Sequence, residues 1–271
     1  MIVDFHTHIF PDKIAQKTID LLSKKGGIPA FSDGSVAGLL EQMETGGVDL
    51  AVTLPVLTNP GQFESVNRFA REINDRFADQ PRRLLSFGGI HPACEDIEKK
   101  MKTLRQSGFL GVKIHPDYQE TFITDEGYVR ILECARDLDM VVVTHAGADG
   151  AYRDRPMRCP PHLAKELIRR VPHSKFVLAH MGGNERFSQV LEELCGSDVY
   201  FDTAYVLKEG EIDDETFCRI VEQHGADRIL FATDSPWSSM RQGVSRLRSL
   251  SLGKTKEDLI FWRNAKDLLG I

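Results

Sequence analysis

The stretch IVDFHTHIFPD, residues 2–12, joins a short apolar run to two closely spaced histidines. Ile2–Phe5 lacks the strict alternation of a strand with one face in water, and such runs are typical of parallel strands buried on both faces. His6 and His8 follow two residues apart in extended chain, so their side chains share one face. The stretch therefore predicts a buried strand that ends in a pair of imidazoles.

Short apolar runs of this kind recur along the chain. They are Ile2–Phe5, Leu50–Val56, Leu84–Ile90, Gly111–Ile114, Met140–Val143, Phe176–Ala179, Val199–Phe201 and Ile229–Ala232. Between them, segments with apolar residues at three- to four-residue spacing predict amphipathic helices. These segments are Asp12–Lys25, Val36–Thr45, Gln62–Ala78, Glu95–Ser107, Asp125–Asp137, Pro161–Val171, Glu185–Cys195 and Asp213–His224, with a closing helix expected at Lys254–Leu269.

Strand and helix thus alternate eight times, which predicts one α/β domain over residues 1–271, a (β/α)8 TIM barrel. A doubly wound open sheet is the alternative. The count of eight favours closure, and no GxGxxG motif follows the first strand.

Polar residues follow the apolar runs at their C-terminal ends. They are His6, His8, His91, Lys113, His115, His145, His180 and Asp234. In a barrel these ends open at one mouth, where the active sites of this architecture lie. We therefore expect side chains that are far apart in the chain to converge there.

The residue types at this mouth indicate a metal site. His6, His8 and His145 offer nitrogen ligands and Asp234 a carboxylate, a set that suits Zn²⁺ or another divalent cation such as Mn²⁺. One ion is expected, with two as the alternative. A lone His-x-His is more often structural, so the prediction depends on the joint occurrence of all these residues.

The overall composition excludes other classes of function. The net charge of −6 and the absence of a long basic run argue against a nucleic-acid partner. The apolar runs are shorter than the ~20 residues of a membrane helix, and MIVDFHTH has no signal-peptide pattern. The sequence predicts a cytoplasmic protein that acts on a small molecule.

The chain resembles the amidohydrolase superfamily, in particular its amidohydrolase-related (amidohydrolase 2) branch. The motifs that carry the resemblance are DFHTHIFPD at 4–12, GVKIHP at 111–116, THAG at 144–147, LAHMGG at 178–183 and ATDSPW at 232–237. The resemblance implies a single barrel, here without room for the β-sandwich of many members. Members of the family commonly form dimers, so a homodimer is an alternative to the monomer.

The resemblance also implies roles for individual residues. The metal ligands would be His6, His8, His145 and Asp234. Asp234 would also take a proton from the attacking water, while His180 would either bind metal or polarise the substrate and transfer a proton. Lys113 matches the strand on which binuclear members carry a carbamylated lysine, so a second metal there is the alternative to a substrate contact. His115 is a further candidate ligand.

The function expected from this resemblance is metal-dependent hydrolysis of an ester, lactone or amide of a small, anionic molecule. The alternative is non-oxidative, metal-dependent decarboxylation of a small unsaturated or aromatic acid. A barrel that keeps its metal only for stability or binding, and a PHP-type phosphoesterase, are weaker alternatives, the latter because ATDSPW fits that family poorly.

Further residues are candidates for substrate contact. Arg153 and Arg155 lie in the segment after the fifth strand, where either could bind an anionic group; a solvated loop is the competing interpretation. Tyr205 and Trp237 are expected to line the pocket or to pack in the core, and His91 is a candidate for the pocket only.

Overall fold

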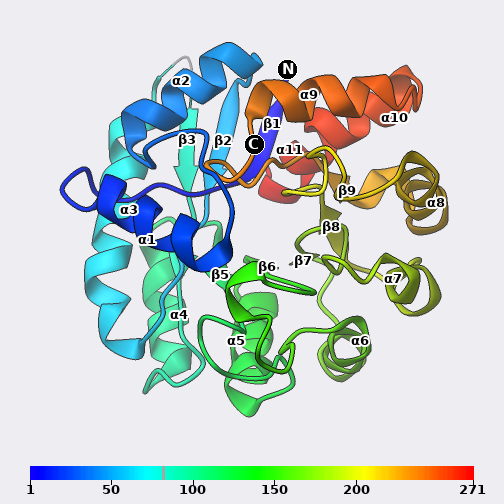
Figure 1. The fold of residues 1–271 in the computed structure, drawn as a ribbon. Coiled ribbons are helices and arrows are strands. Elements are labelled where there is room, and N and C mark those ends of the chain that lie inside the picture. The colour runs from blue at the N-terminus through cyan, green and yellow to red at the C-terminus, as the bar shows by residue number, and fades with distance from the viewer. Residues whose placement is uncertain (81–82) are drawn as a thin grey trace.

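The protein is described here from a computed structural model, which covers residues 1–80 and 83–271. Parallel strands form a central ring and helices surround it (Figure 1). The strands are β1 (Val3–Thr7), β2 (Leu50–Thr53), β3 (Arg83–Ser86), β4 (Gly88–Gly89), β5 (Gly111–Ile114), β6 (Val141–Thr144), β7 (Phe176–Leu178), β8 (Tyr200–Asp202) and β9 (Ile229–Leu230). β3 and β4 together form the third strand of the barrel, interrupted at Phe87.

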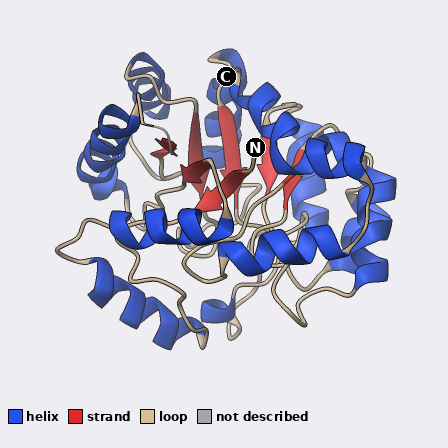
Figure 2. Ribbon diagram, turned by 90° about the horizontal axis from the view of Figure 1, so that it is seen from above, coloured by secondary structure: helices blue, strands red, loops and turns tan. Residues whose placement is uncertain are grey.

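The helices follow the strands in the expected alternation. Figure 2 shows them on both sides of the strands. The α-helices are α1 (Ala15–Gly26), α2 (Val36–Gly46), α3 (Phe63–Phe77), α4 (Ile97–Gln106), α5 (Glu126–Asp137), α6 (Pro161–Arg170), α7 (Phe187–Glu193), α8 (Asp214–His224), α9 (Met240–Ser249), α10 (Lys254–Asp258) and α11 (Asn264–Leu269). Shorter helical turns are η1 (Pro60–Gln62), η2 (Gly150–Tyr152), η3 (Ala226–Arg228) and the π-helical η4 (Leu259–Arg263). The closing helix expected at Lys254–Leu269 consists of α10, η4 and α11 in succession.

Backbone hydrogen bonds join the last strand to the first. Phe5 N donates to Phe231 O at 2.9 Å, and Thr7 pairs with Ser235 in an isolated parallel bridge. On the other side of the ring, Phe87 N donates to Thr53 O at 3.0 Å, so the backbone continues across the interruption between β3 and β4. The predicted TIM barrel is confirmed, and the open-sheet alternative is wrong.

The buried apolar side chains form two layers, because successive residues of a strand point to opposite faces. Val141 and Val143 pack inside the barrel, whereas Val142 packs between the barrel and the surrounding helices. Leu268 and Leu269 of α11 join the inner layer. The last helix therefore covers one end of the barrel, and the other end is left to polar groups.

α9 was not expected from the sequence. Its buried residues Met240, Val244 and Leu247 follow helical spacing, but arginines and serines between them hide the pattern. The side chain of Ser239 accepts a hydrogen bond from Gln242 N and caps the helix. This cap followed by the i, i+4, i+7 pattern is the signal that would have revealed the helix.

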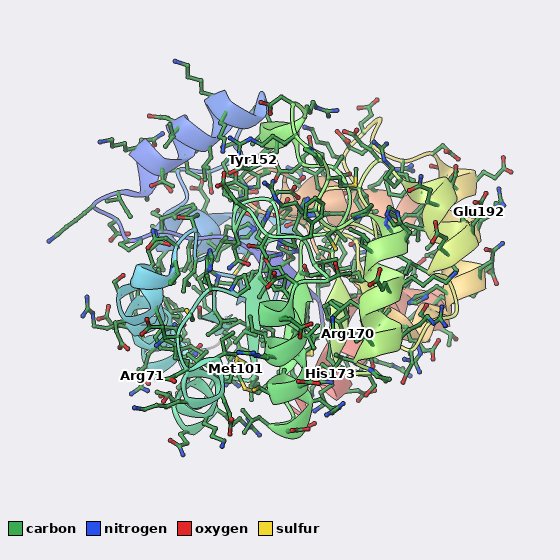
Figure 3. The ribbon with its side chains drawn as sticks, turned by 90° about the horizontal axis from the view of Figure 1, so that it is seen from below. Arg71, Met101, Tyr152, Arg170, His173 and Glu192 are labelled. Atoms are coloured by element: carbon green, nitrogen blue, oxygen red, sulfur yellow. The ribbon has the colours of Figure 1, made fainter. Side chains whose placement is uncertain are left out.

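The two ends of the barrel carry different residues. Figure 3 shows Tyr152, from the segment after β6, at the opposite end of the molecule from His173, which precedes β7. The predicted site residues lie at or after the C-terminal ends of the strands, as Tyr152 does after β6, and belong to the same end. Within residues 1–80 and 83–271, none of the helices combines the length and apolar character needed to cross a bilayer.

Candidate metal centre

The two histidines that end β1 are oriented by hydrogen bonds through their Nδ1 atoms. His6 Nδ1 lies 2.8 Å from Asp202 Oδ2, and His8 Nδ1 lies 2.8 Å from the backbone oxygen of Leu54. Both partners only accept, so each ring carries a proton on Nδ1. The Nε2 atom of each ring therefore carries a lone pair that can bind a metal ion.

Asp234 faces these two nitrogen atoms from the segment after β9, the strand next to β1 in the closed barrel. Its Oδ1 atom lies 3.1 Å from His8 Nε2 and 3.6 Å from His6 Nε2. One potential ligand atom from each of the three residues lies within 4.8 Å of the others. Asp234 adopts a positive φ of 65°, and its backbone N–H donates to His6 O, which ties the carboxylate-bearing turn to β1.

This arrangement fits a divalent cation on chemical grounds. The lone pair of His8 Nε2 and a carboxylate oxygen repel each other at 3.1 Å unless a proton or a metal cation lies between them. Two nitrogens and one carboxylate oxygen match the ligands that Zn²⁺ and Mn²⁺ accept. His6, His8 and Asp234 are thus brought together as predicted.

Asp202, at the end of β8, is a residue of this centre that the sequence analysis missed. Besides accepting from His6 Nδ1, its carboxylate accepts from the backbone N–H groups of His180 and Ala204, at 2.9 and 3.0 Å. It is fully buried, and burial raises its pKa. The run Tyr200-Phe201-Asp202 ends a strand just as the other motifs do, which is the signal that would have revealed it.

Lys113 of β5 lies at the floor of the site. Its Nζ atom is 3.0 Å from His6 Nε2, and burial lowers its pKa to about 8. Burial, followed by the charge of Lys113, holds the pKa of His6 well below its ordinary value. A metal ion bound by His6 would take the lone pair that Lys113 now contacts.

His145 is not placed with the first three ligands. Its Nδ1 lies 2.9 Å from His180 Nε2, and it belongs to a second group with His115 and Asp149. His180 Nδ1 contacts the backbone oxygen of Ala204, so His180 Nε2 accepts from His145 and the Nε2 of His145 keeps its lone pair. Among the described residues that atom is buried and has no hydrogen-bond partner. Its role as a metal ligand stays a prediction.

The second group does not have the orientation of two ligands on one ion. The rings of His115 and His145 are stacked, with centroids 4.3 Å apart and an angle of 9° between their planes. Lone pairs lie in the ring planes, so those of two parallel rings cannot meet at one point unless a ring turns. His115 Nε2 is directed instead toward Asp149 Oδ2, at 3.4 Å.

Electrostatics at the mouth reflect burial first of all. Burial lowers the pKa of His145 to about 3 and of His180 to about 4, so both rings are neutral at neutral pH. Burial alone would raise the pKa of Asp234, but its interactions with the imidazoles of His8 and His6 outweigh burial and hold the pKa below its ordinary value. Asp234 is therefore ionised at neutral pH, as a metal ligand must be.

A cavity of about 640 Å³ opens onto these residues. One wall is apolar and comes from the segment after β1, from α1 and from α3; it includes Phe10, Ile14, Leu22, Ile28, Val66 and Phe69. The floor carries the histidines, Lys113 and Asp234. Of the residues predicted to contact substrate, Tyr205, Trp237 and Arg153 line the cavity.

Two predicted substrate contacts are not brought to the cavity. His91 is buried but lies outside the set of side chains that line it; its Nδ1 accepts instead from Ala93 N. Arg155 is also absent from the lining and pairs with Glu120 at the surface, at 2.5 Å. Both follow a strand on the correct side of the barrel, but the local turn directs each side chain elsewhere.

Known proteins agree with this architecture. The amidohydrolase family model matches residues 3–271. A gamma-resorcylate decarboxylase of Polaromonas sp. (strain JS666 / ATCC BAA-500) is 20% identical over 268 residues, which cover 81% of each chain.

Solved structures share the fold at low identity. A 5-carboxyvanillate decarboxylase of Novosphingobium aromaticivorans DSM 12444 with bound manganese is 14% identical, with a TM-score of 0.71 over 100% of this chain and 97% of that one. A probable 2-pyrone-4,6-dicarboxylic acid hydrolase of Acinetobacter baumannii with bound citric acid is 13% identical, with a TM-score of 0.69 over 100% and 99%. Because the family model covers almost the whole chain, this protein belongs to the amidohydrolase family.

Proposed function

We propose that the chain is a metal-dependent, non-oxidative decarboxylase of a small ring-containing carboxylic acid. The observation that carries the proposal is a cavity with one apolar wall, wide enough for an aromatic ring, whose floor ends on His6, His8 and Asp234. Decarboxylases predominate among the similar proteins named above, and one of them holds manganese. These observations support decarboxylation better than the hydrolysis expected first from the sequence.

The reaction must break one carbon–carbon bond. The bond between the ring and the carboxylate breaks, the carboxylate leaves as CO₂, and the electron pair stays on the ring carbon, which takes up a proton. A divalent cation held by His6, His8 and Asp234 would supply positive charge to the oxygen atoms of the substrate. His145, with its free Nε2 lone pair, is the candidate for a further ligand.

The residues of this chain orient the substrate and move the proton. The apolar wall excludes water from one face of a bound ring. Asp234 and His180 line the cavity and can exchange a proton with a substrate there. His180 can pass a proton on through His145, 2.9 Å away.

The test is CO₂ release by the Mn²⁺-loaded protein from a panel of hydroxylated benzoates that includes 2,6-dihydroxybenzoate. We expect turnover of at least one of them. Asp234→Asn should lower kcat/KM by about 10²-fold or more, because it removes a ligand charge and a proton-transfer group together. Asp75→Asn, on the exposed face of α3, serves as the matched control and should leave the rate unchanged.

Two outcomes would contradict the proposal. Hydrolysis of esters or lactones without CO₂ release would favour the hydrolase instead. A folded protein that binds no metal, with a content no higher than that of a His8→Ala variant, would remove the basis of both activities.

A further inference from the structure

The charged side chains around the cavity influence which carboxylic acids can bind there. We propose that the site selects ring acids that carry a single carboxylate, with hydroxyl or amino groups at the far end, and that it rejects a second carboxylate. This inference rests on the proposed function and narrows it to a substrate class. It also departs from the expectation that Arg153 or Arg155 binds an anionic group of the substrate.

Carboxylates outnumber cations among the side chains that line the cavity. The acidic residues are Asp149, Glu185, Glu211 and Asp234, and the cationic ones are Lys113 and Arg153. Asp234 and Lys113 lie at the floor, where the carboxylate that is lost would bind. Asp149 lies 3.4 Å from His115 and groups with His115 and His145. At the outer part, two acids, Glu185 and Glu211, therefore face one arginine.

That arginine is already paired. Arg153 Nη2 lies 2.5 Å from Glu185 Oε1 and Arg153 Nη1 lies 3.2 Å from Glu185 Oε2, so both carboxylate oxygens are engaged. The pair is partly exposed, with side-chain exposures of 65% and 34%, and contributes little to stability. Its consequence is local: the charge of Arg153 is already offset by Glu185, so a second substrate carboxylate would meet an ion pair without net charge.

Other cations near the mouth have partners as well. Lys25 lies over the ring of Tyr152, 3.8 Å from its centre, and Lys208 Nζ lies 3.3 Å from Tyr205 Oη. Neither lysine is among the described residues that line the cavity. Among the described lysines and arginines, Lys113 and Arg153 are therefore the ones that line the cavity, and Arg153 is paired with Glu185.

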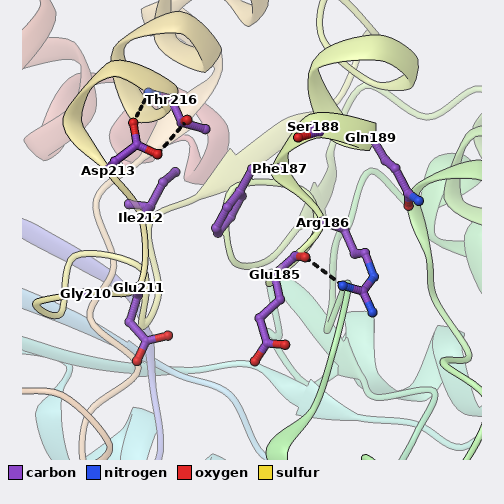
Figure 4. Close-up of a pocket in the computed structure, with 10 residues that line it drawn as sticks. All are labelled: Glu185, Arg186, Phe187, Ser188, Gln189, Gly210, Glu211, Ile212, Asp213 and Thr216. Atoms are coloured by element: carbon purple, nitrogen blue, oxygen red, sulfur yellow. Dashed lines mark hydrogen bonds between the residues drawn. The ribbon is translucent and has the colours of Figure 1, made fainter.

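The acidic character continues outward from the cavity. A groove of about 540 Å³ shares Glu185 and Glu211 with it (Figure 4). Figure 4 shows both carboxylates directed toward the same end of this groove, while Arg186 donates to the backbone oxygen of Glu185 rather than to its carboxylate. The groove next to the cavity should thus favour substrate groups that donate hydrogen bonds over anionic groups.

The fold alone does not determine whether acids with one or with two carboxylates bind. The similar proteins act on acids with one carboxylate, such as gamma-resorcylate (2,6-dihydroxybenzoate), and on acids with two, such as 5-carboxyvanillate. Since one barrel serves both, the charge of individual side chains at the mouth must decide. In this chain those side chains are acidic or paired.

The experiment is calorimetric binding to the Mn²⁺-loaded protein, with CO₂ release followed in parallel. Benzoates with one carboxylate, including 2,6-dihydroxybenzoate, are compared with benzene-1,3-dicarboxylate and 5-carboxyvanillate. We expect the acids with one carboxylate to bind about tenfold more tightly or better, which corresponds to about 1.4 kcal/mol. The ratio between the affinities for acids with one and with two carboxylates should fall toward one at high ionic strength, because salt screens charges at a partly exposed mouth.

Variants separate charge from shape. Glu185→Gln frees Arg153 and should improve binding of the dicarboxylates by about three- to tenfold, with Glu211→Gln acting in the same direction. Glu209→Gln, an exposed neighbour that does not line the cavity, is the control and should change nothing. Equal or tighter binding of dicarboxylates by the unmodified protein, or an unchanged ratio in Glu185→Gln, would overturn the inference.

The outcomes also distinguish this inference from the proposed function. CO₂ release together with a preference for dicarboxylates would overturn the inference alone. Selective binding of acids with one carboxylate without CO₂ release from any of them would support the inference and contradict decarboxylation. Binding of none of the acids would overturn both.

Discussion

Asp202 shows how one buried side chain can prepare a metal ligand. It accepts the Nδ1 proton of His6 and two backbone N–H groups near His180, and so fixes both the ring orientation and the tautomer of His6. Partners of this kind typically affect metal affinity by about 10–100-fold when they are removed. Asp202 is therefore a positioning residue for the candidate centre.

The Asp202→Asn variant tests this role. An asparagine that keeps its two backbone contacts turns its NH₂ group toward His6 Nδ1, so His6 must move its proton to Nε2 and lose its ligand lone pair. We expect Mn²⁺ to bind about 10–100-fold more weakly, measured by titration. Asp198→Asn, at an exposed carboxylate paired with Arg228, is the control. Unchanged affinity in a folded Asp202→Asn protein would contradict the assignment.

Several residues at the mouth have an uncommon backbone conformation. His180, Tyr205 and Asp234 all have positive φ values, of 59°, 66° and 65°, although none of them is glycine. Such conformations cost on the order of 1 kcal/mol each and persist where the surrounding contacts enforce them. In this protein they occur where strands end and side chains must turn into the cavity.

At the scale of elements, the contact between α2 and α9 is tight. Gly46, the last residue of α2, has no room for a side chain: a Cβ there would lie 2.8 Å from Met240 Cβ and 3.2 Å from backbone atoms at the start of α9. α1 ends in the same way, with Gly26 followed by a glycine in the left-handed conformation, but a Cβ at Gly26 meets only Ile28, at 3.4 Å. The two glycines form a matched pair.

Alanine at these two positions should therefore have opposite effects. Gly46→Ala forces two packed helices apart and should lower the free energy of unfolding by about 1–3 kcal/mol. Gly26→Ala should leave it unchanged or raise it by about 0.5 kcal/mol, because alanine favours the helix. Urea unfolding of both variants measures the difference. Equal stability of the two would show that α2 and α9 are not held as closely as described.

At the scale of the whole molecule, buried neutral histidines make stability depend on pH. His224 stacks on Phe201 with centroids 3.7 Å apart, and burial lowers its pKa from 6.5 to about 4. Above pH 6.5 the ring is neutral in both the folded and the unfolded chain. Between pH 6.5 and 4 only the unfolded chain takes up the proton, so stability falls as the pH falls, by on the order of 3 kcal/mol over the full window.

The His224→Gln variant isolates this contribution from that of the metal-centre histidines. We expect its free energy of unfolding to fall less steeply than that of the unmodified protein between pH 7 and 5. His162→Gln, at an exposed histidine of α6, should keep the full slope. Parallel pH profiles for His224→Gln and the unmodified protein would rule out His224 as a source of acid sensitivity.

Much of this molecule could be predicted from local pattern. Each barrel strand is a short, largely buried run of residues, and the first run with the two histidines at its end already contained two residues of the candidate centre. α9 was missed because its apolar residues are diluted by arginine and serine. The break in the third strand was missed because Phe87 continues the apolar run, whereas β3 pairs with β2 and β4 pairs with β5.

The sequence by itself determined the alternation of strands and helices, the end of the barrel that carries the polar residues, and the chemical types available there. These properties follow from the spacing of apolar and polar residues along the chain, because each type of secondary structure has its own period. Tertiary structure alone decided that Asp202 holds His6, that His145 stacks on His115 instead of joining His8, and that Arg153 is neutralised by Glu185. Such pairings join residues far apart in the chain, and ring orientation and barrel register, which no local period encodes, determine which side chains meet.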